Sequence, residues 1–166
     1  SSFPICMTTV SEFIENEEEN ERRLAQFMNW QYVIHQQKGF PYDYIAPDGS
    51  KIEAKFDWDS IKTGNHYLEI AQTNDNKKTW IPSGFSISAD SADFWVVINE
   101  DYIRIFQINV LKKYLNRNRS SLTTKETRAG INYNQHGQFS KAYIIPLKEL
   151  DVACMIKIRN PLQRIV

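Results

Sequence analysis

The pattern of hydrophobic and polar positions in the first third of the chain predicts one helix followed by strands. Apolar side chains recur at helical spacing among glutamates between residues 9 and 30, and either Thr9 or Ser11 is suited to cap this helix. Alternation of polar and apolar residues, with many β-branched and aromatic side chains, is typical of strands. It occurs in the segments 31–35, 42–46 and 50–56. We therefore expect a helix that leads into a sheet.

The same patterns continue through the rest of the chain and indicate an α/β domain. Segments 94–98 and 102–106 predict a hairpin, and 107–116 predicts a basic helix. Residues 117–140 are polar and are interpreted as a long loop, whereas 141–150 is interpreted as a strand that runs into a short helix. No internal repeat is present, and a length of 166 residues is in the usual range for one domain.

Composition agrees with one intracellular domain. The 166 residues, 42% hydrophobic and 13% aromatic, suffice for a single core. The chain has no run of about 18 apolar residues, and residues 1–6 lack the basic start and long apolar stretch of a signal peptide. These features predict a soluble, cytoplasmic protein without a membrane partner. Cys6 and Cys154 are too far apart for a metal knuckle, so reduced structural thiols are expected.

One short turn determines which charged side chains meet. The sequence Pro47–Gly49 suits a type I turn followed by a glycine with positive φ, which would make Ala46 and Ser50 the pair that closes the loop. Counting outward from that pair along the two strands sets Asp43 directly opposite Glu53. A two-residue loop would instead place Asp43 on the other face of the sheet, so this prediction depends on the turn.

The turn therefore predicts a cluster of two carboxylates and one ammonium. Side chains alternate between the faces of a strand, so Glu53 and Lys55 share one face with Asp43. Two carboxylates held together repel one another and lose hydration, a conflict that a hard divalent cation resolves. A surface salt bridge among the three residues is the structural alternative. The three histidines, in contrast, lack zinc-ligand spacing and are interpreted as ordinary core or surface residues.

The Glu-x-Lys triplet at Glu53 is weak evidence by itself. With 11 Glu and 12 Lys in the chain, about 0.8 such triplets are expected by chance. Its context makes it more specific, because Asp43 lies on the partner strand and a glutamate-rich helix precedes both strands. The combination, rather than the triplet, carries the prediction of a metal site.

The chain contains, in this order, a Glu on a helix, an Asp on a strand and a Glu-x-Lys triplet. In this it resembles the PD-(D/E)XK nuclease superfamily of restriction-type endonucleases, phage nucleases and Holliday-junction resolvases. The resemblance covers roughly residues 18–110. Glu18 and Glu19 compete with Glu21 for the helix position, and Tyr42 stands where the motif has Pro. The segments that carry the resemblance are 21–24, 42–45, 52–55, 62–69, 82–85 and 92–95.

This resemblance implies a restriction-endonuclease-like mixed central sheet flanked by helices, and hydrolysis of a phosphodiester bond with Mg2+, for which Mn2+ can substitute. It assigns Asp43, Glu53 and the Ala54 carbonyl as metal ligands, which place the metal to polarise the scissile phosphate. Lys55 would orient the attacking water or neutralise developing charge. Glu21 would bind a second metal or an outer-shell water.

The charge distribution is compatible with a DNA partner, although the net charge is zero. Residues 1–21 contain six Glu and no Lys or Arg, whereas from Tyr102 onward 12 basic side chains face three acidic ones, a net charge of +9. A solvated lysine-rich surface is the alternative interpretation. The candidate DNA-binding residues are Arg22, Lys62, Asn65, Ser83, Arg117, Arg119, Lys125 and Arg128.

The sequence thus predicts a Mg2+-dependent DNA endonuclease, resolvase-like or phage-like, that is structure-selective or only weakly sequence-specific. Two copies could pair as a homodimer to cut two strands. The alternatives are a catalytically idle nuclease fold that binds DNA, and a protein-interaction module that uses the acidic helix and the basic final third of the chain.

Overall fold

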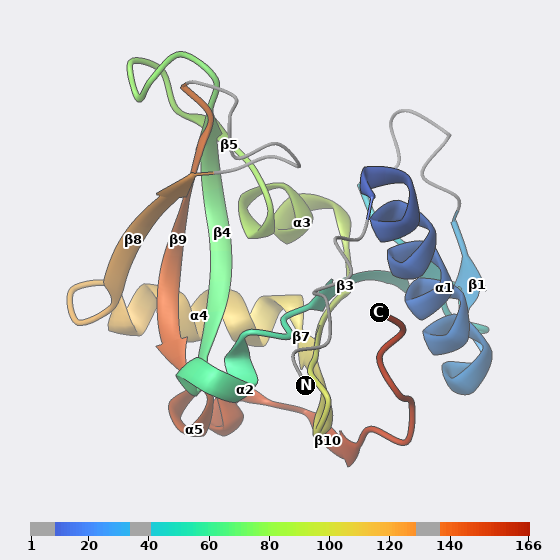
Figure 1. Ribbon diagram of the computed structural model, residues 1–166. Helices are drawn as coiled ribbons and strands as arrows, with labels where there is room; N and C mark the ends of the chain where they lie inside the picture. The colour runs from blue at the N-terminus through green and yellow to red at the C-terminus, as the bar shows by residue number, and fades with distance from the viewer. Residues whose placement is uncertain (1–8, 34–40, 129–136) are drawn as a thin grey trace.

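The computed structural model describes residues 9–33, 41–128 and 137–166 (Figure 1). The described residues form a single α/β domain with five α-helices and two β-sheets, one of six strands and one of four. No described helix is long and apolar enough to span a membrane. The positions of Cys6, His35 and His136 fall outside the described residues.

Helix α1 (Val10–Met28) begins and ends with capping groups that its own sequence supplies. The Glu12 N–H donates to Thr9 Oγ1 and the Thr9 N–H donates to Glu12 Oε2, both at 3.1 Å. This capping box makes Thr9, rather than Ser11, the N-cap. Asn29 closes the other end in the left-handed conformation. The predicted helix is confirmed.

The first sheet is mixed, as predicted. Its strands are β1 (Gln31–Tyr32), β2 (Tyr44–Ile45), β3 (Lys51–Phe56), β6 (Phe94–Ile98), β7 (Tyr102–Gln107) and β10 (Ile156–Arg159). They lie in the order β1-β2-β3-β6-β7-β10, with β3 and β6 parallel and every other neighbouring pair antiparallel. The β6–β7 hairpin is therefore confirmed, whereas β1 and β2 are shorter than predicted.

The turn between β2 and β3 has the predicted geometry. The Ala46 N–H donates to the Ser50 carbonyl at 2.9 Å and the Gly49 N–H donates to the Ala46 carbonyl at 2.8 Å. Gly49 has φ of 87°, which glycine adopts without the steric cost of a Cβ. Beyond the turn, Tyr44 pairs with Ile52. This register sets the preceding Asp43 opposite Glu53.

A second, antiparallel sheet corrects the predicted long loop at 117–140. Its strands are β4 (Asn65–Thr73), β5 (Ile81–Pro82), β8 (Thr123–Arg128) and β9 (Phe139–Pro146), in the order β5-β4-β9-β8. The loop prediction is wrong over β8, an edge strand of polar residues whose one partner within the described residues is β9. Because its side chains are polar on both faces, β8 has no apolar alternation to reveal it. Residues 129–136 lie outside the described residues.

The helices and the second sheet cover the two faces of the first sheet. The remaining helices are α2 (Ser60–Thr63), α3 (Phe85–Ser91), α4 (Ile108–Asn118), α5 (Leu147–Leu150) and a 3-10 turn at Asp151–Ala153. One core joins Leu24 of α1 to Ile52 of β3, and the other joins Trp95 of β6 to Leu68 of β4. Figure 1 accordingly shows α1 and β4 on opposite sides of β3.

The C-terminal segment holds α1 against the first sheet through Asn20. The Asn20 Nδ2 group donates to the Ile165 carbonyl at 3.2 Å, and the Ile165 N–H donates to Asn20 Oδ1 at 2.8 Å. Arg23 donates to the Gln163 carbonyl beside it. Asn20 is buried, so its amide replaces water as the partner of this segment.

We expect Asn20→Ala to lower the free energy of unfolding by about 1–3 kcal/mol, because it leaves two backbone groups without their partner. Urea denaturation measures this change. Glu19→Ala, an exposed neighbour on α1, is the matched control and should be nearly neutral. Equal stability of the two variants would show that the C-terminal segment does not clamp α1.

Candidate active site

Asp43 is fixed by backbone groups of β3. Its own N–H donates to the Ile52 carbonyl at 2.8 Å, and the Ala54 N–H donates to its Oδ2 at 3.0 Å. Asp43 directly precedes β2 and is buried. An extended residue turns its N–H and its C=O to the same neighbouring strand, so the Ala54 carbonyl also points toward the side of Asp43. The local hairpin thus gathers two oxygen donors beside Glu53.

Glu53 and Lys55 form an ion pair on the same face of β3. Lys55 Nζ lies 3.1 Å from Glu53 Oε1, and the two side chains are 38% and 14% exposed, respectively. Burial, together with the negative charge of Asp43, raises the pKa of Glu53 to about 7, although Lys55 acts in the opposite direction. The Glu53 carboxylate therefore carries an unfavourable charge that a further cation would relieve.

Lys55 keeps its proton despite its surroundings. Burial opposes its charge, but the carboxylates of Glu53, Asp43 and Glu69 outweigh burial and raise the pKa of Lys55 above its usual value. The ammonium lies 5.5 Å from the ring centroid of Trp95, within reach of a cation–π interaction. Lys55 is thus a fixed positive charge beside the carboxylates.

Two tyrosines connect Glu21 of α1 to the strands of the site. The Tyr32 hydroxyl donates to the Glu21 carboxylate, and the Tyr44 hydroxyl donates to the Glu21 carbonyl at 2.8 Å. Burial, and then the charge of Glu21, raise the pKa of both tyrosines, and Asp43 acts in the same direction. Sequence reasoning missed this role of the tyrosines, because it depends on how α1 packs on β1 and β2.

The other candidates for the helix position are placed differently. Glu18 lies 3.9 Å from Arg22 in an exposed pair, and Glu19 is exposed. Glu21 differs from both, because its carboxylate accepts the Tyr32 hydroxyl of β1. Its catalytic role stays a prediction.

The oxygen atoms of the site fit a hard divalent cation that takes only a few of its ligands from the protein. Among the described residues, no group of three or more His, Cys, Asp or Glu side chains is placed to hold a metal ion. Asp43 and Glu53 supply two carboxylates, and the Ala54 carbonyl adds a third oxygen. Mg2+ is commonly held by one or two carboxylates and completes its shell with water and substrate phosphate. The donor set suits Mg2+ better than a metal that needs a closed protein cage.

The predicted DNA-binding residues do not form one surface. Asn65, Lys125 and Arg128 line a groove of about 480 Å3 beside Asp57, the residue that directly follows β3. Arg117 and Arg119 border separate hollows around α4. Arg22 and Lys62 are exposed on α1 and α2, whereas Ser83 is buried. The structure therefore brings three of the eight candidates together near the end of β3.

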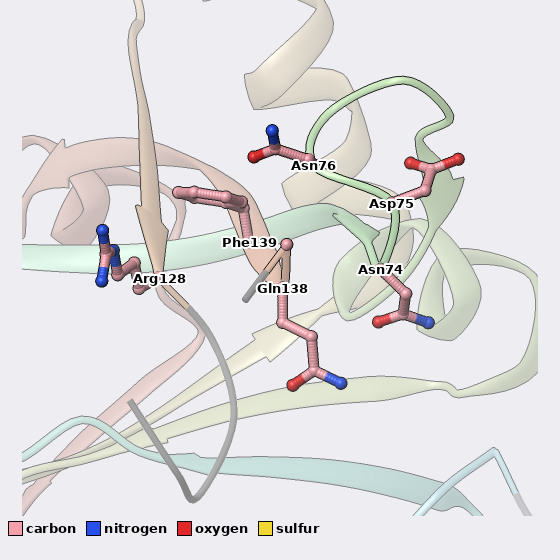
Figure 2. Close-up of a pocket in the computed structure, with 7 residues that line it drawn as sticks. Asn74, Asp75, Asn76, Arg128, Gln138 and Phe139 are labelled. Atoms are coloured by element: carbon pink, nitrogen blue, oxygen red, sulfur yellow. The ribbon is translucent and has the colours of Figure 1, made fainter. Parts of the chain in front are cut away.

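A second hollow of about 340 Å3 lies beside this groove and shares Arg128 with it. Figure 2 shows Asn74, Asp75 and Asn76 on the loop that faces Gln138 and Phe139. Hydrogen bonds from Thr73 and Thr79 to the Asp75 carboxylate lower its pKa to about 2. That carboxylate serves to shape the turn, so the chemistry of this hollow comes from amides and one guanidinium.

Comparison of the chain with models of protein families, with curated proteins and with solved structures finds no match.

Proposed function

We propose that this chain is a Mg2+-dependent DNA endonuclease of the PD-(D/E)XK type. The observation that carries the proposal is the pairing of Asp43 with Glu53 across the β2–β3 hairpin, with Lys55 held 3.1 Å from Glu53. Acidic side chains that are partly buried side by side cost free energy, and such arrangements are characteristic of functional sites. The mixed first sheet with helices on both of its faces is compatible with this class.

In this proposal Asp43, Glu53 and the Ala54 carbonyl hold the cation. When bound, Mg2+ would supply Lewis-acid polarisation of the scissile phosphate and promote ionisation of the attacking water. Asp43 is already oriented by the Ala54 N–H, so the chain loses little freedom when the cation is held. When the cation is bound, the Glu53 carboxylate would interact with both Lys55 and the Mg2+ ion.

The roles of Lys55 and Glu21 follow from their positions. Lys55 carries a proton that it can share with the attacking water or with a phosphate oxygen that gains negative charge. Glu21, tied to β1 and β2 by the hydroxyl of Tyr32 and that of Tyr44, would orient an outer water or a second cation. Each role needs a position fixed to within a fraction of an ångström.

DNA is the proposed substrate because basic side chains border the groove at the end of β3. Lys125 and Arg128 would contact the phosphate backbone there, and Asn65 would donate or accept hydrogen bonds. Asp57 and Asp59 line the same groove, which limits how strongly it attracts phosphate. Few base-reading contacts are expected, so the enzyme would select DNA structure more than sequence.

The proposal predicts metal-dependent cleavage. Purified protein is incubated with supercoiled plasmid, a four-way junction, single-stranded DNA and RNA, with Mg2+, Mn2+ or a chelator. We expect DNA cleavage with Mg2+ or Mn2+ and none with the chelator. Binding without cleavage under every condition would favour the idle DNA-binding module, and cleavage of RNA alone would overturn the assignment of the substrate.

A further inference from the structure

Three hydrogen-bonded side chains, Trp95, His66 and Asp57, lie behind Lys55. Trp95 Nε1 donates to His66 Nε2 at 3.2 Å, and His66 Nδ1 lies 2.7 Å from Asp57 Oδ2. Both the histidine and the tryptophan are fully buried. His66 therefore has no access to a bound substrate, and its contacts are with the interior of the protein.

The hydrogen bonds define the tautomer of His66. An indole N–H can only donate, so Nε2 must accept and cannot carry a proton. The proton is then on Nδ1, which donates to the Asp57 carboxylate. The same carboxylate oxygen also accepts the Tyr67 N–H at 3.0 Å. One imidazole nitrogen of His66 thus donates to Asp57 and the other accepts from Trp95. These two hydrogen bonds fix the orientation of the ring.

This series of hydrogen bonds ends at Trp95, whose ring lies beside the Lys55 ammonium. Trp95 is opposite Glu53 in the β3–β6 register, and its ring centroid lies 5.5 Å from Lys55 Nζ. The rings of Phe85 and Trp95 also meet edge to face, at 87° and with the centroids 5.3 Å apart. The orientation of the Trp95 indole therefore determines where the Lys55 ammonium can contact the electron-rich face of the ring.

A close backbone contact places Phe85. Gly84 has φ of 55°, and a Cβ at this position would lie 2.6 Å from the Glu69 carbonyl oxygen. Only glycine allows α3 to start this close to β4, where Phe85 reaches Trp95. The Pro-Ser-Gly-Phe segment of the sequence thereby acquires a structural role at the site.

We propose that His66, held by Asp57, is a positioning residue that orients Trp95 so that its ring holds Lys55 beside the carboxylates. The inference rests on the proposed nuclease function for its catalytic consequence, but the position of Lys55 can be measured without metal or substrate. The hydrogen bonds connect Trp95 of the first sheet to Asp57, which follows β3, through His66 of the second sheet. The packing of the two sheets thus sets the geometry of the candidate site.

The first measurement is the NMR shift of the Lys55 methylene protons in the metal-free protein. Protons above an indole ring are displaced upfield, and Trp95→Leu supplies the value without a ring. We expect His66→Leu to move the shift toward that value, because the indole loses its acceptor. His66→Gln, whose amide can accept from the indole and donate to Asp57, should keep most of the displacement. An unchanged shift in His66→Leu would overturn the proposal.

The second measurement separates positioning from stability. Leu68→Ala removes a fully buried side chain of the same core two residues from His66, so it is the matched control. We expect His66→Leu to lower kcat about 10- to 100-fold with little change in KM. His66→Gln should retain kcat to within roughly threefold. Equal kcat in His66→Leu and Leu68→Ala, at temperatures where both are folded, would overturn the catalytic part of the inference.

The two measurements distinguish failure of the inference from failure of the proposed function. If the wild type cuts no DNA, the nuclease proposal fails, and the Lys55 shift still decides whether His66 positions the lysine. If the wild type cuts DNA and His66→Leu cuts equally well, only the inference fails.

Discussion

Replacement of Glu53 by Gln is expected to lower the cleavage rate at least about a thousandfold while it stabilises the metal-free protein above pH 7. The loss of activity follows because an amide cannot hold a divalent cation as a carboxylate does. DNA binding should survive or tighten, since one negative charge near the phosphates is removed. Asp43→Asn should behave in the same way in the cleavage assay.

The gain in stability follows from the pKa of Glu53. Burial and Asp43 raise that pKa from 4.5 to about 7 in the folded protein, so the folded state holds the proton more tightly than the unfolded chain. The wild type therefore loses stability as pH rises from about 4.5 to about 7, by about 3 kcal/mol at most. Gln resembles the protonated carboxyl group and avoids this loss. The two proteins should melt alike near pH 4.5 and differ most at pH 8.

Thermal melting across this pH range, with and without Mg2+, tests both effects. Mg2+ should raise the melting temperature of the wild type and leave that of Glu53→Gln unchanged, because a ligand stabilises only the state that binds it. Asp93→Asn is the control, since its carboxylate accepts the Lys51 N–H outside the proposed site. Full cleavage by Glu53→Gln would refute the site, and pH-independent melting differences would refute the assigned cause.

Replacement of Lys55 by Arg is expected to lower the single-turnover cleavage rate about a hundredfold, although the charge is kept. Lys55 is a compact ammonium 3.1 Å from Glu53 and against the Trp95 ring. The guanidinium is wider and planar and would fork onto the carboxylates. A displacement of the attacking water by roughly an ångström accounts for a loss of this size.

The measurement is single-turnover cleavage of the best DNA substrate at saturating Mg2+, with thermal melting to establish folding. Lys51→Arg, on the same strand and exposed, is the matched control and should cleave like the wild type. If Lys55→Arg also cleaves at nearly the wild-type rate, Lys55 is only a charge partner, and the proposed function then rests on the carboxylates alone.

The prediction of the hairpin succeeded because its determinants are local. A turn of three residues fixes the register of β2 and β3, and the register sets Asp43 against Glu53. The loop prediction over β8 failed for the opposite reason. That strand is stabilised by backbone pairing with β9 and by contacts such as the one between Glu126 and Lys77, 2.9 Å apart, neither of which leaves an apolar pattern in its own sequence.

The capped first helix and the register of the hairpin, which brings Asp43 beside Glu53 and Lys55, can be predicted without the fold because each depends on residues close by in the chain. The contact of Glu21 with the strands and the side chains behind Lys55 could not be predicted in this way, because they depend on how distant segments pack. The Trp95–His66 contact spans 29 residues and two sheets. Such a contact exists only where the sheets pack, because the chain must first close long loops before these groups can meet.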